Sequence, residues 1–225
     1  SEYDLCGFKS TGENLEISVN HLHRNGGNNV NHGPLVSIIM TAFNGENFIT
    51  TAVDSICNQT YRNIELIIVD DASQDNTFKL IETLAEKDSR IRPIQLSKNS
   101  GTYAAKNHGL KQSKGKYVTF HDSDDWCHPD KIRIQVEQLE KNNKLIGSTT
   151  CYIRVDENSN IIYSGKGSLR HACISLMISR DKVVSKIGYF DSVRVSADSE
   201  FEERIHAVFG KDRLLHIDLP LIIAS

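Results

Sequence analysis

The chain has 225 residues, of which 39% are hydrophobic and 24% are charged, and its formal net charge is −3 at pH 7. This composition is typical of one well-filled globular domain, or at most two small ones, and the acidic balance argues against a general nucleic-acid binder. No apolar stretch is long enough to span a bilayer and no signal-peptide core is present, so we expect a cytoplasmic protein without a transmembrane segment.

Residues 1–34 differ from the rest of the chain and are predicted to form an N-terminal extension or linker. From Asn20 to Gly33 the sequence reads NHLHRNGGNNVNHG, which has no apolar period and is typical of a loop or linker. Its histidines are better explained as solvated linker residues than as metal ligands. Because the chain opens without Met and with this weak pattern, we expect it to be part of a longer multidomain protein.

From residue 35 to about residue 145, apolar strands alternate with segments of helical period. The predicted strands cover residues 35–41, 64–70, 91–96 and 117–121. Asp75 or Asn76 is predicted to cap the helix after the second strand, and Pro129 to start the helix after the fourth. This alternation predicts a parallel sheet with helices on both faces, and ligands bind such sheets beyond the carboxyl ends of the strands.

After about residue 145 the alternation ends. The pattern predicts strands at 147–155, 160–163, 171–178 and 214–217, a turn at 157–160, and a helix from Asp198 to Phe209. We therefore expect this half of the chain to be mixed or antiparallel and to supply the acceptor side of a cleft.

Five cysteines, an odd number, are scattered through the chain without a CxxC pair. They are Cys6, Cys57, Cys127, Cys151 and Cys173. Such spacing indicates reduced thiols in the cytoplasm and favours neither a disulfide framework nor a zinc site.

The most informative segment is KYVTFHDSDDWCHP, residues 116–129, in which a predicted strand leads directly into Asp122, Asp124 and Asp125. At a separation of about 5 Å and an effective dielectric constant near 20, each pair of like charges costs roughly 3 kcal/mol. A cation would remove this repulsion, and oxygen ligands of this kind suit Mg²⁺ or Mn²⁺ held by carboxylates and substrate phosphates. A solvated acidic turn is the alternative for the segment taken alone.

Several linked segments together resemble family 2 glycosyltransferases of the GT-A fold. They are VSIIMTAFNGENFI, CNQTYRNIELIIVDDASQDNT, NSGTYAAKNHGL, YVTFHDSDDWCHPDKI, KIGYFD and DSEFEER, and they cover roughly residues 35–210 in order. The resemblance implies an inverting enzyme of polysaccharide synthesis. Such an enzyme moves a sugar from a nucleotide-diphospho-sugar, with UDP as the usual carrier, to a hydroxyl of a glycan or lipid-linked acceptor.

The resemblance also implies a mainly parallel central sheet flanked by helices, with a smaller mixed or antiparallel part. The glycosyltransferase domain would span residues 35–225, with a nucleotide-sugar-binding half at 35–145 and an acceptor-side half at 146–225. A lipid-linked acceptor would bring this cytoplasmic enzyme to the inner face of a membrane by peripheral association.

Five nucleotide-binding residues carry over from the family motifs. Asp71 corresponds to the carboxylate that accepts from the base N3–H, and Thr41 would help to hold the base. Gly101 allows close backbone approach, Lys106 would offset diphosphate charge, and Asp122 would face the ribose and the sugar. For Asp71, as for Asp70 before it, a helix-capping turn is the alternative, and for Lys106 the alternative is a solvated helix residue.

The remainder of the acidic segment corresponds to the metal and sugar side of the family's site. Asp124 would bind the Mn²⁺ or Mg²⁺ ion that bridges both phosphates. Asp125 would either touch the donor sugar or orient the loop, and Trp126 would either line the sugar or acceptor side or only pack. His121, His171, His206 or His216 could complete the metal shell, and the alternative for each is a hydrogen-bonded or exposed histidine without a metal.

Asp198 corresponds to the catalytic base, and Arg204 follows it at the family's usual distance of six residues. The chain departs from the family at Ala197, where a Glu is usual, and this leaves Glu200 as an alternative base on the acceptor side. Asp198 as a simple helix cap is a further alternative.

Two other functions compete with an active transferase. One is a catalytically silent nucleotide-sugar-binding module of a larger polysaccharide synthase, for which the DxD motif or the base would be missing. The other is a sugar nucleotidyltransferase, which would need a glycine-rich basic loop after the first strand. The corresponding segment TAFNGENF has one glycine and no basic residue.

Overall fold

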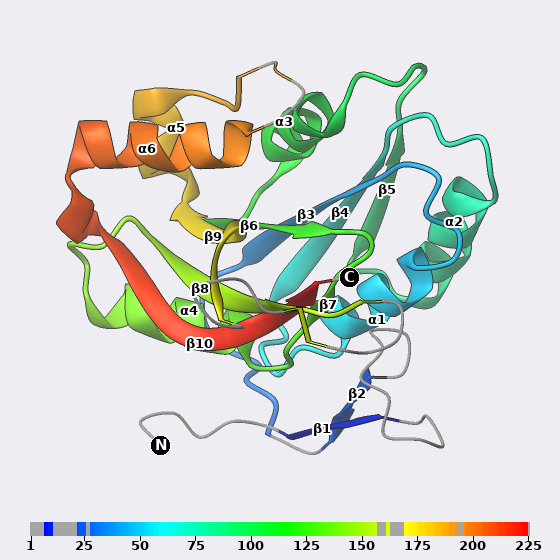
Figure 1. The fold of residues 1–225 in the computed structure, drawn as a ribbon, viewed down its shortest axis with the longest axis horizontal. Coiled ribbons are helices and arrows are strands. Elements are labelled where there is room, and N and C mark those ends of the chain that lie inside the picture. Colours follow the sequence, from blue (N-terminus) through cyan, green and yellow to red (C-terminus); the bar gives the residue numbers. More distant parts are fainter. Residues whose placement is uncertain are drawn as a thin grey trace.

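The computed structural model describes residues 7–10, 22–25, 28–156, 161–162, 169–191, 193 and 196–224. Within this part of the chain, an eight-stranded sheet with the order β5-β4-β3-β6-β9-β8-β10-β7 forms the centre of the molecule (Figure 1). Its strands are β3 (Val36–Ala42), β4 (Ile64–Asp70), β5 (Ile91–Gln95), β6 (Tyr117–Asp122), β7 (Trp126–Cys127), β8 (Gly147–Arg154), β9 (Arg170–Ser179) and β10 (Leu214–Ala224).

The sheet has a parallel half and a mixed half, as the sequence predicts. β5, β4, β3 and β6 are parallel neighbours. β9 runs antiparallel to both β6 and β8, whereas β10 is parallel to β8 and antiparallel to β7. One continuous sheet therefore carries both halves of the chain.

Helices cover both faces of the sheet, because the strands are apolar on both sides. α1 (Ile49–Cys57), α2 (Thr77–Lys87) and α4 (Lys131–Lys141) pack on one face, against Ile38 and Met40 of β3. α3 (Thr102–Gln112), α5 (Arg180–Ile187) and α6 (Ala197–Phe209) pack on the other, and α3 and α5 meet the intervening residue Ile39 and its neighbours. Alternate residues of a strand point to opposite faces, so each strand supplies both cores.

Some predicted boundaries are wrong. α4 begins at Lys131, two residues after Pro129, and β10 continues to Ala224 instead of ending at residue 217. α5, β7 and the short 3₁₀ helix η2 (Lys211–Arg213) were not predicted. Of the strand expected at 160–163, the described residues show only a bridge between Ile161 and Val155, and the turn at 157–160 lies outside the described residues.

The prediction of a structureless segment from residue 20 to residue 33 is also wrong in part. β1 (Gly7–Ser10) and β2 (Leu22–Asn25) pair as a separate antiparallel ribbon, seen at the bottom of Figure 1. The Val30 amide donates to the Thr60 carbonyl at 2.7 Å, which attaches the end of this segment to the main body. None of the described helices is long and apolar enough to cross a membrane.

Candidate active site

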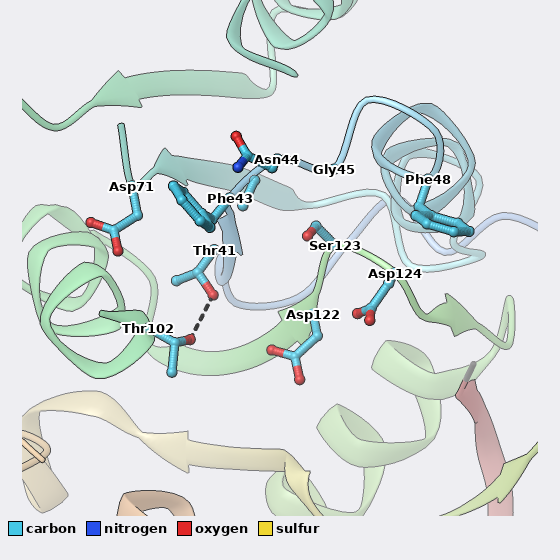
Figure 2. Close-up of a pocket in the computed structure, with 11 residues that line it drawn as sticks. Thr41, Phe43, Asn44, Gly45, Phe48, Asp71, Thr102, Asp122, Ser123 and Asp124 are labelled. Atoms are coloured by element: carbon cyan, nitrogen blue, oxygen red, sulfur yellow. Dashed lines mark hydrogen bonds between the residues drawn. The ribbon is translucent and has the colours of Figure 1, made fainter. Parts of the chain in front are cut away.

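A cleft of about 430 Å³ opens at the carboxyl ends of β3 and β6, where the strand order changes direction (Figure 2). The chain runs from β3 outward to β4 and β5 and then returns to place β6 on the other side of β3. Ligands of α/β sheets bind at such switch points. The cleft is lined by Thr41, Ala42, Phe43, Asn44, Gly45, Phe48, Asp71, Thr102, Asp122, Ser123 and Asp124.

The rim of the cleft is built from two loops that are hydrogen-bonded to each other. The Gly45 amide donates to Thr77 Oγ1 at 2.8 Å, and the Asn44 amide donates to Ser73 Oγ at 2.9 Å. Asn44 and Ala72 adopt left-handed backbone angles, with φ of 50° and 62°. Residues with strained backbone angles persist where surrounding contacts hold the backbone in place, and they are found frequently at functional sites.

Asp70 and Asp71, at the end of β4, have carboxylates with different hydrogen-bond partners. Asp70 accepts from the Ser73 amide at 3.1 Å and the Ser73 hydroxyl at 2.5 Å, which is the turn-forming alternative. Asp71 lines the cleft and accepts from the amides of Ser100 and Gly101, both at 2.8 Å. Gly101 has a φ of 87°, so a glycine suits this entry to α3.

Thr41 and Phe43 lie in the part of the cleft beside Asp71, whereas Phe48 lies at the other end, beyond Ser123 (Figure 2). Thr41 Oγ1 lies 3.0 Å from Thr102 Oγ1, which is the contact dashed in Figure 2. Phe43 and Phe48 line the cleft with 49% and 37% of their surface exposed. Neither residue was predicted as part of the site, although two aromatic residues in a loop after a buried strand are a signal visible in the sequence.

Asp122 and Asp124 both line the cleft and project from the end of β6 and the turn that follows (Figure 2). Burial in this concave site raises the pKa of Asp122; the nearby Lys106 lowers it, while Asp124 and Asp198 raise it further. Burial is the main cause of the increase, and Asp124 and Asp198 add to it because they bring two further carboxylates close to Asp122. A divalent cation would relieve the crowding, so the donor set fits Mn²⁺ or Mg²⁺.

Asp125 and Trp126 are buried, and neither lines the cleft. The Asp125 carbonyl accepts from His121 Nε2 at 3.1 Å, and burial together with Lys131 lowers the pKa of His121 to about 3. Trp126 packs with apolar residues of the sheet edge. Asp125 and Trp126 therefore fit the alternatives of loop orientation and packing, and their contact with the sugar or acceptor stays a prediction.

Lys106 joins the two halves of the site. Its side chain is buried, and its Nζ lies 3.0 Å from Asp198 Oδ1 and 3.8 Å from Asp122 Oδ1. Burial alone would lower the pKa of Lys106, but the two carboxylates outweigh this effect and raise it. Tyr103 donates its hydroxyl to Asp198 Oδ2 at 3.0 Å, so both oxygens of Asp198 are held from α3.

The other acidic candidate, Glu200, is engaged by Arg204, which donates Nε to it at 2.8 Å and lowers its pKa. Arg204 also donates to the carbonyls of Ile187 and Tyr189 at 2.8 and 3.1 Å. Glu200 and Arg204 thus connect α6 to the end of α5, and their contact with the donor or acceptor stays a prediction. Gly101, Lys106 and Asp198 are likewise not among the residues that line the cleft. Of the two candidate bases, only Asp198 is joined to the acidic cluster.

Comparisons with known proteins agree with this geometry. Residues 37–185 match the family model described as glycosyl transferase family 2. Over 158 residues the chain is 35% identical to the Escherichia coli UDP-Glc:alpha-D-GlcNAc-diphosphoundecaprenol beta-1,3-glucosyltransferase WfaP, a match that covers 66% of this chain and 62% of that protein. It is 40% identical over 110 residues to an uncharacterized glycosyltransferase of Haemophilus influenzae, covering 49% of this chain and 44% of that protein.

Two solved structures show a similar fold. Staphylococcus aureus TarS 1–349 in complex with UDP matches with a TM-score of 0.69 and 22% identity, over 84% of this chain and 60% of that one. The mannosyltransferase PcManGT of Pyrobaculum calidifontis, in complex with GDP-Man and Mn²⁺, matches with a TM-score of 0.69 and 19% identity, over 88% and 59%. The chain thus spans less than two thirds of the length of each of these relatives.

Proposed function

The chain belongs to glycosyl transferase family 2 and is a glycosyltransferase with the GT-A fold, and on this premise we propose the reaction that its cleft carries out. It transfers a sugar from a nucleotide-diphospho-sugar, with inversion, to a hydroxyl of a glycan or lipid-linked acceptor in polysaccharide synthesis. UDP is the proposed carrier, supported by the UDP-glucose named for WfaP and the UDP bound to TarS. A lipid-linked acceptor would bring the enzyme to the inner face of a membrane.

The nucleoside would bind beside Asp71 and Thr41. Asp71 uses one lone pair on each oxygen for the amides of Ser100 and Gly101, so each oxygen can accept again. The base N3–H is a suitable donor for this second bond. The exposed ring of Phe43 borders the same space and offers an apolar face for the base.

The diphosphate would lie over the acidic part of the cleft. Asp122 and Asp124 would hold Mn²⁺ or Mg²⁺, and this ion would offset the negative charge on the departing nucleoside diphosphate. The shared position of these two carboxylates in the cleft lining supports such a role, and Asp124 is one of the groups that raise the pKa of Asp122. Ser123, between them, lines the same wall.

Asp198 would act as the general base that removes the proton from the acceptor hydroxyl. Its hydrogen bonds to Lys106 and Tyr103 fix the orientation of the carboxylate beside Asp122. A carboxylate helps only as the hydroxyl becomes acidic in the transition state, and such catalysis contributes about 10²- to 10⁴-fold. The proposed displacement occurs in one step and inverts the anomeric carbon, because it needs no carboxylate nucleophile.

The observation that carries this proposal is the Lys106 bridge, which brings the proposed base to the DxD carboxylates. The test is a screen of UDP-sugars with Mn²⁺, followed by transfer assays on the variants Asp198→Asn and Glu200→Gln. We expect Asp198→Asn to bind UDP normally and lose transfer by at least about 10²-fold, while Glu200→Gln keeps it. Full transfer by Asp198→Asn would contradict the assignment of the base.

A second variant tests the donor side. We expect Asp124→Ala to abolish the Mn²⁺-dependent stabilisation of the chain by UDP, measured as a shift of melting temperature. Equal protection by UDP with and without Mn²⁺ in the wild type would contradict the metal assignment. Binding of a nucleotide-sugar by the wild type without any transfer would instead favour the silent binding module.

A further inference from the structure

A second group of metal-ligand side chains lies between β9 and α6. His171 Nε2 is 3.0 Å from each carboxylate oxygen of Glu202, and Cys173 lies two residues along the same strand. The ligand atoms of these three residues all lie within 4.8 Å of one another. Cys173 Sγ is also 3.7 Å from Ser199 Oγ, so both strand residues meet α6.

The chemistry of this group differs from that of the cleft. Asp122 and Asp124 offer only oxygen, whereas this group offers an imidazole, a thiol and a carboxylate. Nitrogen and sulfur ligands favour Zn²⁺ over Mg²⁺, and three protein ligands with one open position are a common zinc arrangement. Neighbouring ligand atoms around a tetrahedral zinc ion are roughly 3.4 Å apart, close to the 3.0 Å between His171 and Glu202.

A chain of hydrogen bonds behind His171 suits its Nε2 as a ligand. His171 Nδ1 lies 3.2 Å from His216 Nδ1, and His216 Nε2 lies 3.1 Å from Asp218 Oδ1. In one consistent assignment of the protons, His171 Nδ1–H donates to His216 Nδ1, and His216 Nε2–H donates to Asp218. His171 Nε2 then carries no proton and can bind the metal. Metal-bound histidines are typically oriented by such a bond from their other nitrogen.

A competing set, Cys151, His216 and Asp218, is less suited to a stable site. It would require His216 Nε2 as the ligand, and the side chain of Asp218 is 85% exposed. The side chain of Glu202, in contrast, is only 12% exposed, so its carboxylate is held in place between strand and helix.

We propose that His171, Cys173 and Glu202 bind Zn²⁺ and that this site fixes α6 against β9. Asp198 precedes Glu202 by four residues on the same helix, so the two lie on one face of α6, one turn apart. Zinc would therefore act as a positioning element for Asp198, without touching the substrate.

The primary experiment adds Co²⁺ to the metal-free chain and records its absorption spectrum, because a thiolate bound to Co²⁺ gives a charge-transfer band. We expect one Co²⁺ per chain and a tetrahedral spectrum. Cys173→Ser should lose the charge-transfer band, whereas the matched control Cys151→Ser should keep it. Asp124→Ala should also keep it, which separates this site from the cleft.

Zinc binding gives a second, independent readout. Zn²⁺ should raise the melting temperature of the wild type and of Cys151→Ser, but not that of Cys173→Ser. His216→Ala should weaken zinc affinity about 10- to 100-fold, through the lost orientation of His171. If Cys173→Ser fails to fold, Glu202→Gln provides the test, with the band retained and the affinity reduced.

The proposal is overturned if the wild type shows no charge-transfer band, or if Cys151→Ser removes the band and Cys173→Ser does not. The positioning role rests in addition on the proposed transferase activity. For that role, Cys173→Ser should lower kcat for transfer and leave the Kd for UDP unchanged. An unchanged kcat would refute the positioning role while leaving the spectroscopic result intact.

Discussion

Replacement of Lys106 by methionine tests whether the two halves of the site are energetically coupled. Methionine keeps most of the length and volume of the lysine stem but removes the ammonium group, which lies over the rings of Tyr103 and Phe120. It removes the charge whose Nζ lies 3.0 Å from Asp198 and 3.8 Å from Asp122. The change therefore separates the electrostatic role of Lys106 from its volume.

The expected loss of stability follows from the exposure of the partners. Breaking a fully buried pair costs about 3–5 kcal/mol, and a hydrogen bond to a charged group contributes about 1.5–3 kcal/mol. The side chains of Asp198 and Asp122 are 24% and 41% exposed, so water replaces part of what Lys106 supplies. The longer contact with the more exposed Asp122 adds less than about 1 kcal/mol. We expect Lys106→Met to reduce the free energy of unfolding by about 2–3 kcal/mol.

Urea unfolding of the wild type, Lys106→Met, Asp198→Asn and the double variant forms a double-mutant cycle. We expect a coupling energy of at least about 1.5 kcal/mol, within the range for residues in one hydrogen-bonded network. Lys111→Met is the matched control, because Lys111 is an exposed lysine of the same helix whose Nζ lies 5.2 Å from the centre of the Tyr189 ring, and it should change stability by less than about 1 kcal/mol. Additivity of Lys106→Met and Asp198→Asn within about 0.5 kcal/mol would refute the coupling.

Three further substitutions test the site and its frame. Because the folded-state pKa of Asp122 is raised, its proton is bound more tightly in the folded chain, and stability is lost as pH rises from the ordinary value of 3.8 through the raised value. Asp122→Asn should remove this loss and make the metal-free chain more stable at pH 7 than the wild type, by urea unfolding. Equal or lower stability would contradict the raised pKa of Asp122. Ala72→Gly should be neutral or stabilising by up to about 1 kcal/mol, since glycine accepts the left-handed φ of 62° without strain, and a clear loss in melting temperature would count against that strain. Trp126→Ala should destabilise the chain by about 3–5 kcal/mol without weakening UDP binding, and the reverse pattern in unfolding and binding assays would return Trp126 to the donor site.

The parallel half of the fold was predictable because its strands are continuous apolar runs. All seven residues of β4 are buried, which is what IELIIVD indicates for a strand covered on both faces. The strand predicted at 214–217 ends too early because Pro220 interrupts the apolar pattern of β10. The pairing register with β8 also shifts on both sides of that residue. α5 was missed because it has eight residues and only Val183 and Ile187 are buried.

The site was predictable where its residues are close in sequence. The acidic segment after β6 showed Asp122 and Asp124 together, and both line the cleft. The contact between Lys106 and Asp198 joins residues 92 positions apart and depends on the sheet, so no local pattern could reveal it. In contrast, the bond between Glu200 and Arg204 follows from their i, i+4 spacing on a helix and could have been predicted.

The role of the cysteines was also hidden from the sequence, because it depends on contacts between residues that are distant along the chain. Scattered spacing without a CxxC pair argued against a zinc site, because that rule considers only ligands that are neighbours in sequence. The fold brings Cys173 and His171 of β9 to Glu202 of α6, about thirty residues away. Ligand groups that form across secondary-structure elements are visible only once the tertiary structure is known.

The junction between the two halves of the sheet gives a rule for exchanging parts between related enzymes. β6 and β9 are paired over Tyr117–Ser179, Val118–Ile178 and Thr119–Met177, while α4 leads into β8 through a short turn that follows Lys141. A hybrid protein joined at that turn would keep every residue of the cleft lining and import a foreign C-terminal part. Its success would depend on whether the imported counterpart of β9 pairs with these three residues of β6, and on whether the counterpart of α6 places a carboxylate at the ammonium group of Lys106.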